Sequence, residues 1–498
     1  MAKNGFVRQQ GFSYKILNTW VGALLLTLIA VGFGYLMATQ MILGIGVLGL
    51  FLALFILGLC IYNAEAGIYI TFAFTFVFCD IGRMIFTNGD VQLGLVPDVL
   101  MLATFSGLFS QKARLRESVN AFFKAPVVTW TLVLFGYSLV QVANPFAHSV
   151  EGWVQGARRV LENLVFLFIL FHVFNSWEKT RSMLKVLFVL CLLAGIYACI
   201  QQKFGYFAFD KYFIMSSPTR MGLLFIGGDF RKFSSMSDPA SFGMLMAAAA
   251  VFYIIIAIHQ DKSYRKWVLI IGSLIMLMGM SYSGTRTANV MVAAGLAMFM
   301  LLSAHKRVAW VFGITCGVIF VVLLNLPIYS NRTLNRFRTS FQGTNDASFN
   351  VRELDRKMIQ PYLLVHPIGG GFGTTGDKGK SLNPGHPLAG FQTDDGYLRY
   401  GLEIGWIGLI LFLVVNYLIL RTGAKAYFRT PNQRMKYVYA AAITALFTFM
   451  IAELAQEVIG QICCDVLIYP LIAMILRMSY EDNKEALAAP DAAAVPGL

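Results

Sequence analysis

Charged residues are scarce in this sequence. Only 13% of its 498 residues are Asp, Glu, Lys or Arg, whereas 57% are hydrophobic and the mean hydropathy is +0.65. A water-soluble domain has no core large enough to bury so much apolar surface. The composition therefore excludes a soluble globular protein and predicts a chain that crosses a membrane many times.

Cysteine is absent from the polar segments. All seven cysteines lie inside or at the edge of apolar runs, so the sequence predicts neither a disulfide framework nor a zinc site. The polar segments also hold no group of His, Asp and Glu at the spacing of a metal site, and we expect no metal and no cofactor. The glycine-rich segment His366–Gly373 (HPIGGGFG) lacks the lysine and the hydroxyl of a P-loop, which argues against a nucleotide site.

Apolar runs, in contrast, fill most of the chain. About fourteen of them are long enough to cross a bilayer core of about 30 Å. They lie near 20–38, 41–62, 66–84, 95–111, 126–143, 160–176, 186–202, 239–258, 267–283, 287–304, 308–327, 401–420, 437–455 and 461–477. We expect an all-α fold, a polytopic transmembrane bundle of about 12–14 helices.

The basic residues predict how this bundle is oriented. Alternate connections between the apolar runs are rich in Lys and Arg and share one side with the basic N-terminus, which the positive-inside rule makes cytoplasmic. The segments 202–238 and 328–400 then face out. We expect an N-terminal transmembrane bundle at 1–327, an extracytoplasmic loop that carries the chemistry at 328–400, C-terminal transmembrane helices at 401–480 and a disordered cytoplasmic tail at 481–498.

Arg286 is the most informative single residue. It lies in MGMSYSGTRTANVMV, a polar interruption between two apolar runs. An arginine near membrane depth is costly and usually faces a cavity or a partner. The alternative is an interfacial arginine whose side chain extends to the outer surface. We favour the functional interpretation because Ser, Gly and Thr residues form a polar break around Arg286.

The outward loop ends in two acidic residues. Asp394 and Asp395 can supply a general base, or they can cap the next helix and keep the loop solvated, and both interpretations stay open. Glu403 is a third carboxylate, which we interpret as a residue at the start of that helix. Tyr397 can stack on a sugar or belong to the aromatic belt at the membrane surface.

Glycines and a histidine shape the middle of the same loop. Gly369, Gly371 and Gly373 permit tight turns and a close approach of the backbone to a ligand. His366 precedes a proline, and a structural role suits it as well as a catalytic one.

Several segments, taken in chain order, carry a resemblance. They are EAGIYITFAF at Glu65–Phe74, FRKFSSMSDPASFGMLM at Phe230–Met246, the segment around Arg286, then Arg352, HPIGGGFG at His366–Gly373, and DDGYLRYGLEIGWIGLILFL at Asp394–Leu413. Together, in this order and spacing, they resemble the O-antigen polymerase and ligase superfamily (Wzy-type polymerases and WaaL-type ligases). Where ligases carry a histidine before a Tyr-Leu pair, this sequence has Asp394 and Asp395, which is more like the polymerase branch.

This resemblance implies a metal-independent membrane glycosyltransferase of the GT-C type. It would polymerise O-antigen or exopolysaccharide from an undecaprenyl-diphosphate-linked oligosaccharide, at the periplasmic face of the bacterial inner membrane. Because the lipid diphosphate is a good leaving group, the reaction needs cationic stabilisation of the diphosphate and a base for the acceptor hydroxyl. The arginines expected to bind the diphosphate are Arg231, Arg286 and Arg352, and the expected catalytic residues are Arg286, Asp394 and Asp395.

Other functions remain open at this stage. The expected partners are the lipid-linked oligosaccharide, membrane lipids, a chain-length regulator and a flippase, and nucleic acid is not expected. The alternatives are an O-antigen ligase of the same superfamily, a flippase that transports the lipid-linked substrate, and a non-catalytic scaffold for polysaccharide export. Transporters commonly show internal repeats and charge at mid-span. The sequence has no convincing repeat and its polar motifs lie at one face, which favours an enzyme.

Overall fold

The computed structural model describes residues 19–85, 94–325 apart from 111, 227 and 306, and 347–488, together with 335, 338 and 341. Most of these residues are helical, which confirms the predicted all-α class. The single sheet within these ranges is one antiparallel pair, β1 (Phe225–Ile226) with β2 (Asp229–Phe230).

The helices follow one another through the described chain. The first half contains α2 (Trp20–Thr39), α3 (Met41–Tyr62), α4 (Ala64–Ile85), α5 (Leu95–Leu108), α6 (Lys112–Phe123), α7 (Pro126–Val140), the 3-10 turn η1 (Gln141–Ala143), α8 (Val150–Val173), α9 (Trp177–Phe204), α10 (Ala208–Met215) and α11 (Pro218–Leu224). The second half contains α12 (Pro239–Ile258), α13 (Ser263–Ser283), α14 (Arg286–Leu302), α15 (Arg307–Asn325), α17 (Ala347–Val365), α18 (Gly376–Leu382), α19 (Gly396–Arg429), α20 (Gln433–Ala452) and α21 (Ile462–Ala488).

Each of the fourteen predicted apolar runs overlaps one of these helices within the described residues. Among the described residues, ten helices are long and apolar enough to cross a membrane. Two further apolar helices, α5 and α14, have 14 and 17 residues and fall short of that length. The protein is therefore a polytopic helical bundle, as its composition predicts.

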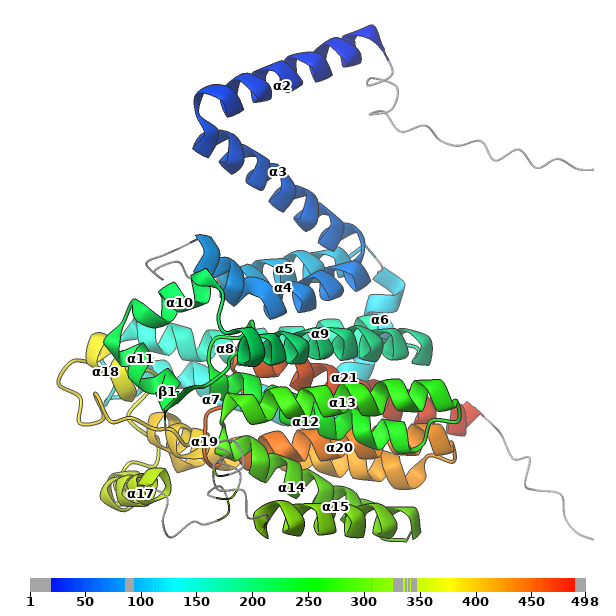
Figure 1. Cartoon of the computed structure of the whole chain (residues 1–498), viewed down its shortest axis with the longest axis vertical. Coiled ribbons are helices and arrows are strands. Elements are labelled where there is room, and N and C mark those ends of the chain that lie inside the picture. Colours follow the sequence, from blue (N-terminus) through cyan, green and yellow to red (C-terminus); the bar gives the residue numbers. More distant parts are fainter. Residues whose placement is uncertain are drawn as a thin grey trace, which may run out of the picture.

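Helix α12 lies at the centre of the bundle and packs against α9, α13, α14, α20 and α21. Its buried run of alanines, Ala247–Ala250, lets neighbouring helices come close, as small residues do in membrane interfaces. The helix starts sharply because Asp238 accepts hydrogen bonds from the N–H groups of Ala240 and Ser241 at 2.8 and 2.9 Å, with Pro239 in the first turn. Figure 1 shows α2 and α3 extending away from this bundle.

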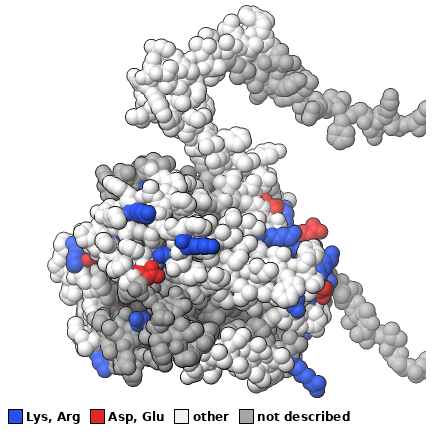
Figure 2. All heavy atoms as spheres, viewed as in Figure 1, with Lys and Arg blue, Asp and Glu red and all other residues white. Residues whose placement is uncertain are grey.

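The shorter elements gather at one end of the spanning helices. Figure 1 shows α10, α11, β1, α17 and α18 together on the left, with α17 viewed along its axis while the spans run across the view. On the face drawn in Figure 2, most of the Lys, Arg, Asp and Glu side chains lie toward the two ends of the spans. We call the end with α10, α11, α17 and α18 the loop face.

The spans α19 and α21 differ from the prediction at their ends. Helix α19 starts at Gly396, with Asp395 as its N-cap, so Glu403 lies well inside the helix rather than at its start. Helix α21 continues to Ala488, and residues 481–488 of the predicted disordered tail are helical, while 489–498 lie outside the described residues. An ion pair between Arg477 and Glu481, at 2.5 Å, supports this extension.

Helix α19 is broken at Gly405. This residue has φ 72° and ψ 174°, a conformation that favours glycine over residues with a side chain. The break releases the carbonyls of Leu402 and Glu403, which accept hydrogen bonds from the N–H groups of Gly370 and Gly371 at 2.8 and 2.7 Å. The glycine-rich loop thus supplies the hydrogen bonds that the helix loses, as a broken membrane helix requires.

Candidate functional site

The turn between α13 and α14, at the loop face, binds one of the predicted arginines and precedes another. Gly284 ends α13 in the left-handed conformation, and Arg286 is the first residue of α14. Arg231, from the segment before α12, donates from Nε to the carbonyl of Ser283 at 2.9 Å and from Nη2 to Thr285 Oγ1 at 3.1 Å. The polar interruption in the sequence is therefore a turn that holds Arg231 next to the start of α14.

Contacts with α12 fix this turn. The Thr285 hydroxyl donates to the carbonyl of Pro239 at 2.9 Å, and Ser283 Oγ lies within 3.0 Å of the same hydroxyl. A Cβ at Gly243 would overlap Ser283 Oγ, so the glycine permits α12 to approach the turn. Since Thr285 uses its hydroxyl in this way, it does not cap α14.

A buried ion pair that the sequence-based predictions did not include anchors the segment carrying Arg231. Arg83 of α4 pairs with Asp80 at 2.9 Å and with the fully buried Asp210 of α10 at 3.4 Å. Its guanidinium also donates to the carbonyls of Ser234 and Met236. An arginine and an aspartate inside an apolar run could have indicated this network, because charges at that depth are usually paired.

At the start of α19, Asp394 and Asp395 have different environments. Asp395 is buried, and its Oδ1 accepts from the Leu398 N–H at 3.2 Å, which is the capping arrangement. Its Oδ2 accepts from Arg356 Nε of α17 at 3.0 Å. Asp394 is exposed. Asp395 therefore caps α19 and anchors α17, and Asp394 is the more accessible carboxylate.

The glycines of the loop contact protein backbone. Gly369, Gly371 and Gly373 all have positive φ, at 72°, 95° and 68°. A Cβ at Gly373 would lie 3.1 Å from the Cα of Gly152 in α8. The loop is shaped by these glycines so that it fits between α8 and the break in α19.

Two further predicted residues, His366 and Tyr397, contact other residues of the protein. The His366 ring stacks on Tyr362 with ring centroids 3.9 Å apart, and its edge contacts Phe146. The Tyr397 hydroxyl donates to the carbonyl of Met450 at 2.9 Å. Arg352 lies in α17, and its side chain is outside the described part of the structure.

The connection between α20 and α21, residues 453–461, joins several helices. Glu457 pairs with Arg159 of α8 at 2.9 Å and with Arg399 of α19. Gln461 accepts from the hydroxyl of Ser241 in α12. This connection was missed by the predictions, although its sequence, ELAQEVIGQ, is an acidic and polar gap between two apolar runs.

Glu457 and its partners line a cavity of about 60 Å³ at the loop face. Arg399 also pairs with Glu403 at 3.3 Å, and the Thr375 hydroxyl donates to Glu403 at 2.5 Å. Lys378 of α18 lines the same cavity. Its pKa is lowered from the usual value, mainly because the amine is partly buried and also because the positive charges of Arg159 and Arg399 lie nearby. We call this the charged cavity.

The predicted residues do not all meet in one cavity. Arg231 and Arg286 lie at the start of α14, and Asp394 and Asp395 lie at the start of α19. Helix α20 packs against both α14 and α19, so these two starts flank its outer end. Within the described chain, no three His, Cys, Asp or Glu side chains lie close enough to hold a metal ion. Independence from metal remains a prediction.

The middle of the chain matches a known protein family. Residues 271–413 match the family model described as O-antigen ligase. This match confirms the predicted resemblance to the O-antigen polymerase and ligase superfamily, and it supports that type of function in general. It includes Arg286, the glycine-rich loop, Asp394 and the break in α19. A comparison with curated proteins found no match.

Proposed function

We propose that the protein is a polysaccharide polymerase of the bacterial inner membrane. It transfers an oligosaccharide from an undecaprenyl-diphosphate carrier to an acceptor sugar at the loop face, which is periplasmic. The observation that carries this proposal is the position of Arg231, held by Ser283 and Thr285 beside the start of α14 where Arg286 lies.

Arg231 and Arg286 suit a diphosphate leaving group. Guanidinium groups bind phosphate oxygens through two parallel hydrogen bonds, and the N-terminus of α14 adds a partial positive charge. Fixing Arg231 in the turn before substrate arrives means that little reorganisation accompanies the reaction. Arg352 is the third arginine proposed to contact the diphosphate.

The proposed reaction has one proton to place. The acceptor hydroxyl oxygen attacks the anomeric carbon, the bond from that carbon to the diphosphate oxygen breaks, and the electron pair stays on the diphosphate. The hydroxyl proton passes to Asp394, which is exposed, whereas Asp395 is buried. Asp395 positions Asp394 by fixing the start of α19. The leaving group carries the charge to be stabilised, so no metal is required by this scheme.

A ligase is the second candidate, because the matching family model is described as O-antigen ligase. The two functions differ in the acceptor, which is another lipid-linked repeat for a polymerase and a lipid A core for a ligase. In the ligases that this sequence resembles, a histidine stands where this chain has Asp394. The acidic residue favours the polymerase.

Reconstitution tests the proposal directly. Purified protein in lipid nanodiscs is incubated with lipid-linked oligosaccharide extracted from the producing cells, in excess EDTA, and the products are separated by length. A polymerase yields a ladder of lengthened lipid-linked products. Transfer that occurs only when lipid A core is added would identify a ligase, and no transfer to either acceptor would contradict both functions.

A further inference from the structure

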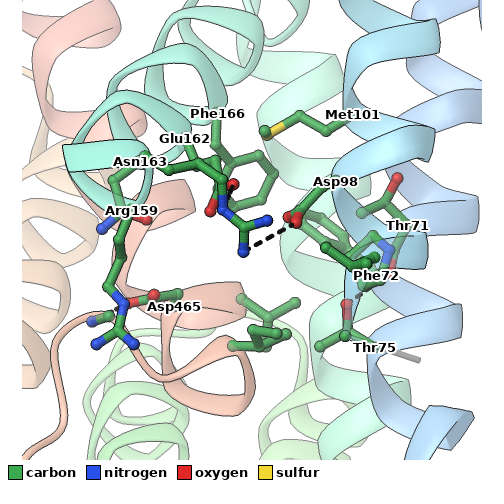
Figure 3. Close-up of a pocket in the computed structure, with 17 residues that line it drawn as sticks. Thr71, Phe72, Thr75, Asp98, Met101, Arg159, Glu162, Asn163, Phe166 and Asp465 are labelled. Carbon is green, nitrogen blue, oxygen red and sulfur yellow. Dashed lines mark hydrogen bonds and ion pairs between the residues drawn. The ribbon is translucent and has the colours of Figure 1, made fainter. Parts of the chain in front are cut away.

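A cavity of about 240 Å³ lies between α4 and α5 on one side and α8 and α21 on the other. It extends from the first turns of α5 and α21 at the loop face to Thr71 and Phe166 inside the bundle. Figure 3 shows Thr71 and Thr75 of α4 across the cavity from Asn163 of α8. None of the catalytic or substrate-binding residues predicted from the sequence lines it.

The charges in this cavity are already matched within the protein. Arg158 and Arg159 face three carboxylates, those of Asp98, Glu162 and Asp465. Arg158 Nε pairs with Glu162 at 2.8 Å, and Arg158 Nη2 lies 3.9 Å from an Asp98 carboxylate oxygen. Arg159 pairs with Glu457. The lining has no excess of positive charge, so it does not suit a phosphate or diphosphate.

The other lining groups suit an uncharged ligand with many hydroxyls. Thr75 Oγ1 donates to the carbonyl of Thr71 at 2.9 Å, which leaves the hydroxyl oxygen able to accept a hydrogen bond. The Asn163 amide adds donors and an acceptor, and the carboxylates are acceptors. The ring of Phe166, which packs at 85° to the buried ring of Phe72, offers apolar surface for a face of a sugar.

A series of contacts links α4, which lines the cavity, to the segment before α12. Cys79, one helical turn after Thr75, contacts Cys463 of α21, whose sulfur is 3.9 Å from Ser237 Oγ. Ser237 donates to Asp238, which caps α12 in the same segment as Arg231. These contacts connect the helix that carries Thr75 with the segment that carries Arg231.

We infer that this cavity binds the saccharide of the acceptor substrate. The inference rests on the proposed glycosyl transfer, since an acceptor is meaningful only for a transferase. The ligand class is an uncharged or weakly charged oligosaccharide, recognised through hydroxyl groups by Thr75, Asn163 and the carboxylates of α8 and α5.

Binding measurements on full-length protein in nanodiscs test this assignment. The first probe is the free oligosaccharide released by mild acid from the lipid-linked pool of the producing cells, and the second is farnesyl diphosphate. Each is titrated while the thermal midpoint is measured. Thr75→Val and Asn163→Leu should each weaken saccharide binding about tenfold, which is the loss of about one or two hydrogen bonds, and should leave farnesyl diphosphate binding unchanged.

Thr315→Val is the matched control. Thr315 donates to the carbonyl of Val311 at 2.8 Å, as Thr75 does to that of Thr71, but it is exposed on α15. This variant should bind both probes as the wild type does. The inference would be overturned if the wild type did not bind the saccharide. It would also be overturned if Thr75→Val and Asn163→Leu bound the saccharide as tightly as the wild type does.

The second probe separates this inference from the proposed function. If Thr75→Val weakens farnesyl diphosphate binding, the cavity holds the lipid diphosphate and the saccharide assignment is wrong, whereas the proposed function stands. If Arg286→Ala leaves farnesyl diphosphate binding intact while Thr75→Val still weakens saccharide binding, the proposed diphosphate site is wrong and the saccharide site stands.

Discussion

Gly405 and Pro367 lie so close together that the carbonyl oxygen of Pro367 occupies the space in which a side chain at residue 405 would begin. The contact joins the break in α19 to the glycine-rich loop, whose Gly370 and Gly371 donate to the carbonyls released by the break. The loop and the helix therefore form one unit, and a change at either partner should affect both.

Gly405→Ala should destabilise the protein strongly. The added methyl group overlaps the Pro367 carbonyl and forces a positive φ on a residue with a side chain, and strain of this kind costs about 2 kcal/mol or more. The unfolding midpoint of the purified protein measures the effect. Gly136→Ala is the control, because a Cβ at Gly136 in α7 has no atom within 4 Å, and we expect its midpoint to stay close to the wild type. Equal midpoints for both variants would contradict the overlap.

Glu453 should make stability depend on pH. It is the C-cap of α20 and fully buried, and burial raises its pKa from 4.5 to about 8. The N–H groups of Ile459 and Val458 oppose this rise, whereas Glu457 and Asp465 add to it. The folded state thus holds a proton that the unfolded state releases near pH 4.5. The resulting stability is fully present below pH 4.5 and is lost as the pH rises through about 8.

Glu453→Gln checks this dependence. A glutamine cannot ionise, so its midpoint should change less between pH 6 and pH 9 than that of the wild type, which should fall across this window. Both proteins are melted in the same nanodiscs and buffers. A wild-type midpoint that rises from pH 6 to pH 9 would have the wrong sign and would contradict the buried, protonated state of Glu453.

Much of the fold could be predicted from the sequence because membrane spans are local properties of composition. The apolar runs near 239–258 and 267–283 coincide closely with α12 and α13. The start of α19 was placed five residues late because Gly396 to Tyr400 is less apolar than the rest of the helix. The helix begins at Gly396 since Asp395 caps it.

The candidate site was only partly predictable. Arg286 and Arg231 were predicted from their sequence context, and in the structure Arg231 donates to Ser283 and Thr285, which directly precede Arg286. Glu457 was missed because its partners are far away in sequence: Arg159 precedes it by 298 residues. Such pairing depends on how helices pack, and a single sequence carries no direct record of it.

Asp394 and Asp395 should respond differently to the same substitution. Asparagine caps a helix nearly as well as aspartate, so Asp395→Asn keeps the cap and loses only the ion pair with Arg356, which is half exposed. Such a pair contributes about 1 kcal/mol or less. Asp394→Asn removes the proposed base, which contributes about a hundredfold or more to the rate.

The rate of elongation and the unfolding midpoint separate the two roles. We expect Asp395→Asn to retain most of the elongation, and Asp394→Asn to lose nearly all of it at an unchanged midpoint. The reverse result would assign the base to Asp395. Normal elongation by both variants would show that neither carboxylate accepts the proton.

The loop face should be accessible from outside the cell membrane. A cysteine replacing Ser381, an exposed residue of α18, should react with an impermeant thiol reagent in intact spheroplasts. A cysteine replacing Ser263, exposed at the start of α13 on the opposite end, should react only after lysis. The wild-type chain gives the background of its own cysteines. Labelling in the opposite order would reverse the orientation and remove the periplasmic substrate from the account.

The role of Arg286 is the central claim. Lysine keeps its charge but lacks the planar fork that binds two phosphate oxygens, and alanine removes both. We therefore expect Arg286→Ala to lower elongation by about a hundredfold or more, equivalent to about 3 kcal/mol, and Arg286→Lys to recover only a small part. Arg434→Ala is the control, since Arg434 is exposed and pairs with Asp261 at the end opposite the loop face.

The most direct test measures product length from purified Arg286→Ala, Arg286→Lys and Arg434→Ala in nanodiscs, with the same lipid-linked oligosaccharide and with equal amounts of folded protein. The predicted result is a full ladder from Arg434→Ala, a faint ladder from Arg286→Lys and none from Arg286→Ala. A ladder of wild-type length and rate from Arg286→Ala would contradict the account.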